Sequence, residues 1–308
     1  MRFLVYGKII IDSIRLSSGA VTHSSLGGGG PQAAFGMRLW SDSVALLTRS
    51  GTDLNPPLVA ALERLGLDLS GWARFDDLPT PRGLVEYDEH ERMLDHGLVT
   101  GRDAWFALLG RPLTVSEAHL RADGIHLVTE FGREPIIDTA RAMQRGGALL
   151  SLEPIFDPRH CPDRGALLDL ARQADLVTPD WPAAASLAQS DDLTAVLRFW
   201  VDLGARAVAI RRGSQGSYVC DAASRQAWHI PPLPVQIIDP TGAGNAYGGG
   251  WCVGWSRTHD VRRAGCYATA AAAMMLSHVG MPDFNEQTYQ RAAELFDLAL
   301  SRSQPLAI

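Results

Sequence analysis

Short apolar runs alternate with segments of helical periodicity along most of the chain, and this alternation restricts the possible folds more than any other feature. The apolar runs are nearly continuous, as is typical of strands covered on both faces, and they occupy residues 3–11, 44–47, 125–128, 149–152, 176–177 and 207–210. Segments with helical spacing lie between them, at residues 58–65, 135–144, 167–173 and 193–203. The pattern predicts an α/β fold with a doubly wound, mostly parallel sheet flanked by helices.

Two insertions break this alternation. Residues 13–25 are polar and rich in Ser and Thr, and residues 82–95 mix apolar side chains with charges. They are either ordinary surface loops or exposed strands that together form a small β lid, and we favour the lid. The length of 308 residues permits one large domain or two small ones. Because no linker or repeat divides the chain, we expect a single domain over residues 1–308, with three helices after Gly242.

Charge and cysteine content favour a cytoplasmic protein with a small-molecule partner. The net charge is −6 and the basic residues are scattered, so the chain lacks the basic patch typical of proteins that bind nucleic acid or anionic lipid. We expect the cysteines to be reduced and buried, because they lie far apart, at Cys161, Cys220, Cys252 and Cys266. Lys8 and Asp12 interrupt the first apolar run, which indicates a strand rather than a signal peptide, and no later run is long enough to cross a bilayer.

A glycine-rich turn is the sharpest local feature. The sequence Asp239-Pro240-Thr241-Gly242-Ala243-Gly244-Asn245 precedes a run of small and apolar residues, so a loop enters a helix here. Glycines let backbone N–H groups point toward one place, and the start of a helix adds its positive dipole end. The turn is therefore either a phosphate cradle or simply a tight turn.

Further motifs accompany this turn and together resemble the ribokinase-like (PfkB) family, whose corresponding signature reads Asp-Thr-Thr-Gly-Ala-Gly-Asp. The resemblance extends over essentially the whole chain, because the matching pieces follow the family order. They are Asp12 after the first strand, the turn 27–34 that contains Gly28, Gly29 and Gln32, the turn 213–216 that contains Gly213 and Gly216, and the small-residue segment 270–273 followed by Gly280.

The resemblance implies an ATP-dependent phosphotransferase that acts on a hydroxyl of a sugar, nucleoside or related molecule, with Mg²⁺ as a companion of ATP. It places the transferred phosphate over Gly242, Ala243 and Gly244, with Asn245 orienting the acceptor alcohol. It assigns acceptor binding to a second group of residues, Asp12, Gly28, Gly29 and Gln32. It assigns nucleotide binding to a third group, Asp180, Arg211, Gly213, Gly216 and Thr241. Lid strands of this family often pair between subunits, which suggests a homodimer.

Two departures from the family pattern affect the chemistry. Asn245 stands where active members have an Asp that takes the hydroxyl proton, and a carboxamide has no usable proton affinity near neutral pH. The family's Asn-x-x-Glu motif is replaced by Asp180-Trp181-Pro182-Ala183. Asp180 either holds a metal-bound water or caps the helix that follows, and capping is the simpler role. Both departures resemble a divergent subgroup that has Asn after Gly-x-Gly and Glu-Pro after a central strand.

These departures leave alternatives open. The chain is either a phosphotransferase of reduced or altered activity, a catalytically inactive ligand sensor, or an enzyme with other chemistry on a related ligand, because a fold does not fix a reaction. If the acceptor geometry is intact, an Asn245→Asp substitution is expected to raise the transfer rate. Glu153 ends a strand at a position that often faces ligand, whereas His126 is expected to be a core histidine.

Overall fold

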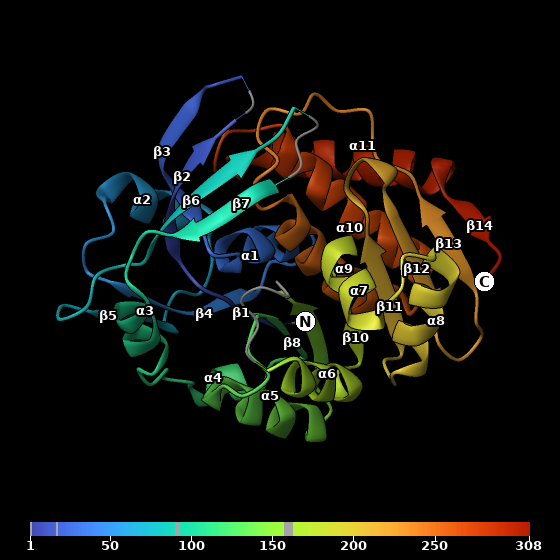
Figure 1. The fold of residues 1–308 in the computed structure, drawn as a ribbon, viewed down its shortest axis with the longest axis horizontal. Coiled ribbons are helices and arrows are strands. Elements are labelled where there is room, and N and C mark those ends of the chain that lie inside the picture. The colour runs from blue at the N-terminus through green and yellow to red at the C-terminus, as the bar shows by residue number, and fades with distance from the viewer. Residues whose placement is uncertain (1, 17, 90–92, 157–162) are drawn as a thin grey trace.

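A ten-stranded sheet forms the centre of the structure (Figure 1). The computed structural model describes residues 2–16, 18–89, 93–156 and 163–308. Across the sheet the order is β14-β13-β12-β11-β10-β9-β8-β1-β4-β5. The strands are β1 (Phe3–Tyr6), β4 (Val44–Gly51), β5 (Trp72–Phe75), β8 (Gly124–Thr129), β9 (Leu149–Pro154), β10 (Leu176–Val177), β11 (Ala207–Arg211), β12 (Ser217–Asp221), β13 (Ala227–Ile230) and β14 (Gln304–Leu306). Neighbours from β5 to β11 run parallel, and β12 to β14 continue the sheet antiparallel.

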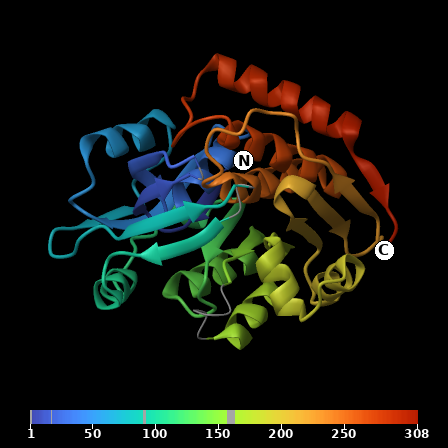
Figure 2. The same ribbon diagram turned by 45° about the horizontal axis from the view of Figure 1, so that its top comes forward.

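Helices cover both faces of this sheet, and the predicted α/β class is confirmed. One face carries α1 (Gly30–Arg38), α2 (Pro56–Arg64), α9 (Ala243–Thr258), α10 (Val261–Leu276) and α11 (Glu286–Arg302). The other face carries α3 (Arg102–Leu109), α4 (Glu117–Leu120), α5 (Pro135–Arg145), α6 (Arg164–Gln173), α7 (Trp181–Ala188) and α8 (Leu193–Asp202). Figure 2 shows α11 and the green and yellow helices on opposite sides of the sheet. Each layer buries its own apolar core, as a two-faced sheet requires.

A second, four-stranded sheet lies beside the main one and corresponds to the expected lid (Figure 1). Its strands are β2 (Ile10–Arg15), β3 (Val21–Gly27), β6 (Arg82–Tyr87) and β7 (Met93–Leu98), in the order β3-β2-β6-β7. Strands β2 and β6 pair in parallel, and each has an antiparallel outer neighbour. We call this sheet the lid. It has a small core of its own, formed by Ile14, Val85 and Tyr87.

The first apolar run does not form one strand. Strand β1 ends at Tyr6 in the main sheet, and β2 begins at Ile10 in the lid. Between them Gly7 lies against α1, where a Cβ atom would be 2.5 Å from Gly30 Cα. The run is apolar on both sides of Gly7 and Lys8 because both segments are buried, one in the main sheet and the other at the base of the lid. Apolar character alone therefore cannot show where the chain changes sheets.

The described cysteines and the helices after Gly242 agree with the sequence-based expectations. Cys220, Cys252 and Cys266 are free and buried, as expected, whereas Cys161 lies outside the described residues. Three helices follow Gly242, as expected, and a short edge strand, β14, ends the chain. Within the part of the chain that the structure describes, no helix has the length and apolar character needed to cross a membrane.

Candidate active site

Helix α9 begins without a side-chain cap. Its N-cap residue, Gly242, has a left-handed backbone with φ 77°, and no acidic residue occupies the first turn. The Asp239 carboxylate stabilises the preceding turn by accepting a hydrogen bond from the Thr241 N–H at 2.9 Å. Among the described residues, the N–H groups of Gly244 and Asn245 have no backbone partner. This half-exposed helix end is therefore positive and suited to an anion.

The second glycine-rich turn precedes α1 and faces the first one. Gly28 and Gly29 have φ values of 84° and 80°, in the left-handed region that favours glycine. The Lys8 carbonyl lies beneath this turn and accepts a hydrogen bond from the Gly30 N–H at 3.3 Å. A Cβ atom at Gly29 would lie 2.8 Å from Asn245 Nδ2. The acceptor turn expected from the sequence therefore contacts the start of α9.

Close packing of α1 against α9 explains why the two turns meet. A Cβ atom at Gly36 would overlap the Ala246 carbonyl, and one at Gly249 would overlap the Ala33 carbonyl. The two backbones thus approach each other at positions where only glycine fits. At the N-terminal ends of the two helices, Gly29 approaches Asn245 and the Gln32 side chain fills the space beside Gly242, so both positive ends lie at the same place.

Gln32, one of the residues assigned to acceptor binding, is almost fully buried, with 1% of its surface exposed. Its Nε2 donates a hydrogen bond to the Leu26 carbonyl at 2.5 Å, and its side chain fills the space where a Cβ atom at Gly242 would lie. Gln32 Oε1 has no hydrogen-bond partner among the described residues. Gln32 therefore connects the end of β3 in the lid to the start of α9, and its amide oxygen remains without a hydrogen-bond partner among the described residues.

Asn245 is held by a buried carboxylate at the end of β9. Its Nδ2 donates a hydrogen bond to Glu153 Oε1 at 2.9 Å, and Arg211 Nη1 forms an ion pair with the same oxygen at 2.8 Å. The other carboxylate oxygen, Glu153 Oε2, lies 3.4 Å from His126 Nε2, while His126 Nδ1 lies 2.9 Å from Ser151 Oγ. His126 is completely buried, as expected for a core histidine, but it faces this polar cluster.

Arg211 connects this cluster to the start of α9. It ends β11, and a Cβ atom at Gly244 would overlap its Nη1 atom. The guanidinium therefore lies directly beside the first turn of α9. Together the helix end and Arg211 provide positive charge where an anion is expected, and a planar guanidinium is well suited to phosphate.

Asp180 has the capping role that the sequence favoured. Its Oδ1 accepts a hydrogen bond from the Ala183 N–H at 2.9 Å at the start of α7. Asp180 also forms a backbone bridge with Arg211, so this exposed residue lies beside the end of β11. The Arg212 guanidinium stacks 3.8 Å from the centre of the Trp181 ring. Among the described residues, no group of three or more His, Cys, Asp or Glu side chains is placed to hold a metal ion.

Gly213 and Gly216 lie in the turn that follows Arg211. Gly213 begins a short 3₁₀ turn (Gly213–Gln215) directly after β11, and both glycines have positive φ values, of 52° and 80°. A Cβ atom at Gly216 would overlap the Ile230 carbonyl, so this glycine packs against the next hairpin. The turn follows Arg211, whose side chain reaches the start of α9.

Asp12 lies at the base of the lid. It is buried, with 2% of its surface exposed, and its Oδ2 occupies the space where Gly27 lacks a Cβ atom. From β6 of the lid, the Tyr87 hydroxyl donates a hydrogen bond to Thr241 Oγ1 at 3.1 Å. Burial raises the pKa of Tyr87 to about 12; the bond to Thr241 opposes this shift, and the Asp239 and Asp12 carboxylates add to it. Asp12 and Tyr87 therefore lie close to the glycine-rich turn.

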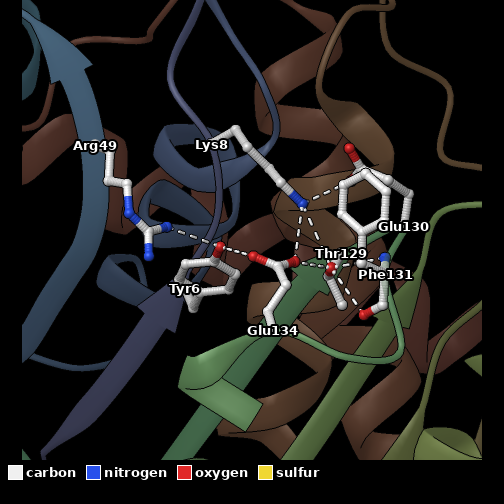
Figure 3. A network of polar contacts seen from close by, with 7 residues as sticks. All are labelled: Tyr6, Lys8, Arg49, Thr129, Glu130, Phe131 and Glu134. Carbon is white, nitrogen blue, oxygen red and sulfur yellow. Dashed lines mark hydrogen bonds and ion pairs between the residues drawn. The ribbon is translucent and has the colours of Figure 1, made fainter. Parts of the chain in front are cut away.

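A polar cluster that the sequence did not predict surrounds the side chain of Lys8 (Figure 3). Lys8 Nζ forms ion pairs with Glu130 Oε2 at 2.6 Å and with Glu134 Oε1 at 3.5 Å. Glu134 also accepts a short hydrogen bond from the Tyr6 hydroxyl, and Arg49 Nη1 donates to that hydroxyl at 3.1 Å. Lys8 is 6% exposed. A lysine inside an apolar run was the available signal, because a buried ammonium requires anionic partners.

The chain is similar in sequence to one family of known proteins. The model of the pfkB family of carbohydrate kinases matches residues 2–287. The chain is 25% identical over 254 residues to a cytidine kinase of Thermococcus kodakarensis, covering 82% of this chain and 88% of that protein. It is 28% identical over 257 residues to an ATP-dependent ribose-1-phosphate kinase of Halopiger xanaduensis, covering 82% and 81%.

Solved structures with the same fold include ribokinases. The ribokinase of Arabidopsis thaliana, complexed with ribose and ATP, superposes with a TM-score of 0.75 at 18% identity, covering 96% of this chain and 98% of that one. An Escherichia coli protein provisionally assigned as ribokinase II, in complex with ATP and Mg²⁺, gives a TM-score of 0.77 at 18% identity, covering 96% and 99%.

Proposed function

Because the chain belongs to the pfkB family of carbohydrate kinases and is a small-molecule kinase, we propose that it transfers the γ-phosphoryl group of ATP to a hydroxyl at the start of α9. The observation that carries this proposal is the meeting of three positive groups at one place. The uncapped N-terminus of α9 and the N-terminus of α1 are in contact through Gly29 and Asn245, and Arg211 lies beside Gly244. Such a site stabilises the charge on a phosphoryl group in transfer.

The acceptor approaches from the side of the lid. In this arrangement Asp12, Gly28, Gly29 and Gln32 hold the acceptor, and Asn245 Oδ1 accepts a hydrogen bond from the reacting hydroxyl. The hydroxyl oxygen bonds to the γ-phosphorus, the bond to the β,γ-bridging oxygen breaks, and ADP leaves. The hydroxyl proton passes to a phosphoryl oxygen, because a carboxamide cannot take it. Loss of a general base typically costs about 10²–10⁴ in rate, so we expect slow turnover.

The nucleotide lies along the carboxyl end of β11 and the N-terminus of α7. Arg211 and Thr241 contact its phosphates, and Gly213 and Gly216 shape the turn beside it. Mg²⁺ takes most of its ligands from phosphate and water and needs only one or two carboxylates, and Asp180 fits this need because the helix cap uses one of its two oxygens. Bound Mg²⁺ would neutralise charge on the transferred phosphate.

Relatives suggest the acceptors to test first. The cytidine kinase and the ribose-1-phosphate kinase are named for different acceptors, so cytidine, ribose and ribose 1-phosphate form the first panel, with ATP and Mg²⁺. We expect transfer to one of these or to a related sugar or nucleoside. No transfer to any member of a broad panel of sugars and nucleosides would contradict the proposal.

A matched pair of glycine variants links transfer to the site. Gly242→Ala forces a side chain into the space of Gln32 at φ 77°, whereas Gly66→Ala has a similar φ of 63° and no neighbour closer than 3.8 Å. Both variants suffer the backbone strain of a left-handed alanine. We expect only Gly242→Ala to lose transfer.

Asn245 favours a second candidate function, a protein that binds its ligand without turnover. The half-exposed Asn245 offers hydrogen bonds to a sugar or nucleoside but no base. This candidate predicts that ligands raise the melting temperature, because they bind only the native state, while mass spectrometry finds them unchanged in the presence of ATP and Mg²⁺.

A further inference from the structure

The side chain of Glu153 makes three polar contacts that bear on the start of α9. It is 2% exposed, and its Oε1 lies 2.8 Å from Arg211 Nη1 and 2.9 Å from Asn245 Nδ2. Its Oε2 lies 3.4 Å from His126 Nε2, and a Cβ atom at Gly248 would be 2.6 Å from this oxygen. Packing by α9 therefore leaves the carboxylate little freedom to move.

We propose that Glu153 is a positioning residue that fixes the orientation of Asn245 and makes a carboxamide, rather than a carboxylate, the compatible group at position 245. The proposal rests on the phosphotransferase function for its effect on catalysis. The pairing itself rests only on the contacts between the two side chains.

The orientation of Asn245 follows from hydrogen-bonding chemistry. An ionised carboxylate only accepts hydrogen bonds, so the amide nitrogen of Asn245 has to face Glu153. The amide oxygen is bonded to the same carbon and is therefore directed away from Glu153. Asn245 is half-exposed, and its oxygen is thus available to orient an acceptor hydroxyl. Glu153 sets this orientation without touching the acceptor itself.

The same contact determines what an aspartate at position 245 would do. Asn245→Asp replaces the donating nitrogen by an oxygen at about 3 Å from Glu153 Oε1, and two carboxylates at this distance do not both ionise. The new group would then be protonated or turned away, and it would not act as a base. The expected gain in rate for Asn245→Asp therefore requires a second change, Glu153→Gln, which replaces the carboxylate by an amide that can donate a hydrogen bond. The two changes together leave the net charge of the cluster unchanged.

The test is a cycle of four proteins: the wild type, Asn245→Asp, Glu153→Gln and the double variant. Transfer from ATP and the free energy of unfolding in urea are measured for each. We expect Asn245→Asp to be less stable than the wild type, with a deficit that shrinks as the pH falls because protonation relieves the repulsion. We expect the double variant to recover stability and to transfer phosphate about tenfold faster than either single variant, because the effects of changes at two residues in contact are not additive.

A matched control removes a different buried carboxylate. Asp175 is 7% exposed and pairs with Arg206 at 2.9 Å, but it directly precedes β10 and so lies at the amino ends of the parallel strands, whereas Glu153 lies at their carboxyl ends. Combined with Asn245→Asp, the Asp175→Asn change should show additive effects on stability and no rescue of transfer. This control separates coupling through contact from a general loss of stability.

The two proposals fail in different ways. Additive effects of the Glu153 and Asn245 changes on unfolding would overturn the pairing, whether or not transfer is detected. A non-additive unfolding cycle, with no transfer by any of the four proteins to any acceptor, would uphold the pairing and overturn the phosphotransferase function. Faster transfer by Asn245→Asp alone than by the double variant would overturn the positioning role.

Discussion

The Tyr87 hydroxyl in the lid donates a hydrogen bond to Thr241 Oγ1 at 3.1 Å and so joins the lid to the glycine-rich turn before α9. The contact links residues 154 positions apart in the sequence. In the proposed function, this bond would hold the lid against the turn that binds the transferred phosphate.

Replacing Tyr87 by Phe removes this bond and keeps the ring. We expect the KM for the acceptor to rise several-fold while kcat changes less, because the bond positions the lid rather than the phosphate. The loss in stability should be about 1 kcal/mol, the usual net value of one hydrogen bond. Tyr289→Phe is the control, since its hydroxyl bonds to Arg38 on the far side of α1. Equal kinetic effects of both changes would contradict the role of Tyr87.

The acceptor turn is tested by Gly29→Ala. The substitution adds a Cβ atom 2.8 Å from Asn245 Nδ2 at a residue with φ 80°, so it both strains the backbone and displaces the amide. Gly147→Ala has φ 101° and no atom within 4 Å of the new Cβ. Both changes cost about 1–2 kcal/mol of stability from backbone strain. Only Gly29→Ala should abolish transfer, measured at saturating ATP.

Arg211 is expected to matter for both stability and nucleotide binding. Arg211→Met leaves the buried Glu153 carboxylate without its cationic partner, which typically costs about 3–5 kcal/mol. Adding Glu153→Gln should restore much of this loss, as measured by urea unfolding. The stabilisation by ATP in thermal unfolding should remain weak in the double variant, because the guanidinium beside Gly244 is still absent. Full recovery of the ATP effect would show that Arg211 does not contact the nucleotide.

The sequence predicts the class of the fold and the glycine-rich turns, because both are local signals. Residues 241–245 read as a loop that enters a helix, and α9 begins there with Gly242 as its cap. The carboxyl ends of parallel strands also marked Glu153 as a position of interest. What the sequence does not contain is the distance between elements. The contact of Glu153 with Asn245 joins residues 92 positions apart, and only the packing of α9 on β9 creates it.

The same limit applies to the change from β1 to β2 and to the Lys8 cluster. The run is apolar on both sides of Gly7 and Lys8, because both sheets bury it, and a single lysine does not by itself indicate a passage from one sheet to another. Lys8 is visible in the sequence as an interruption of that run, but its partners Glu130 and Glu134 come from the loop between β8 and α5 and the start of α5. Long-range pairing of this kind depends on topology and leaves no local pattern.

The Lys8 cluster should make stability depend on pH. Burial by itself raises the pKa of Glu134, but Lys8, Thr129 and Tyr6 outweigh it and hold this pKa below its usual range. Burial likewise lowers the pKa of Lys8, but the charges of Glu130 and Glu134 outweigh it and raise this pKa above its usual range. Stability from Glu134 is therefore present above its unfolded pKa, about 4.3, and is lost as the pH falls through its lower folded value.

The sign for Lys8 is the opposite. Its contribution is complete below its unfolded pKa, about 10.4, and is lost as the pH rises through the higher folded value. We therefore expect Glu134→Gln to be less stable than the wild type at neutral pH, with a difference in unfolding free energy that narrows below about pH 4. Urea unfolding of both proteins between pH 3 and pH 8, on the order of one pH unit per step, measures this difference. A difference that stays constant down to the lowest pH would show that the Glu134 carboxylate owes no stability to the charge of Lys8.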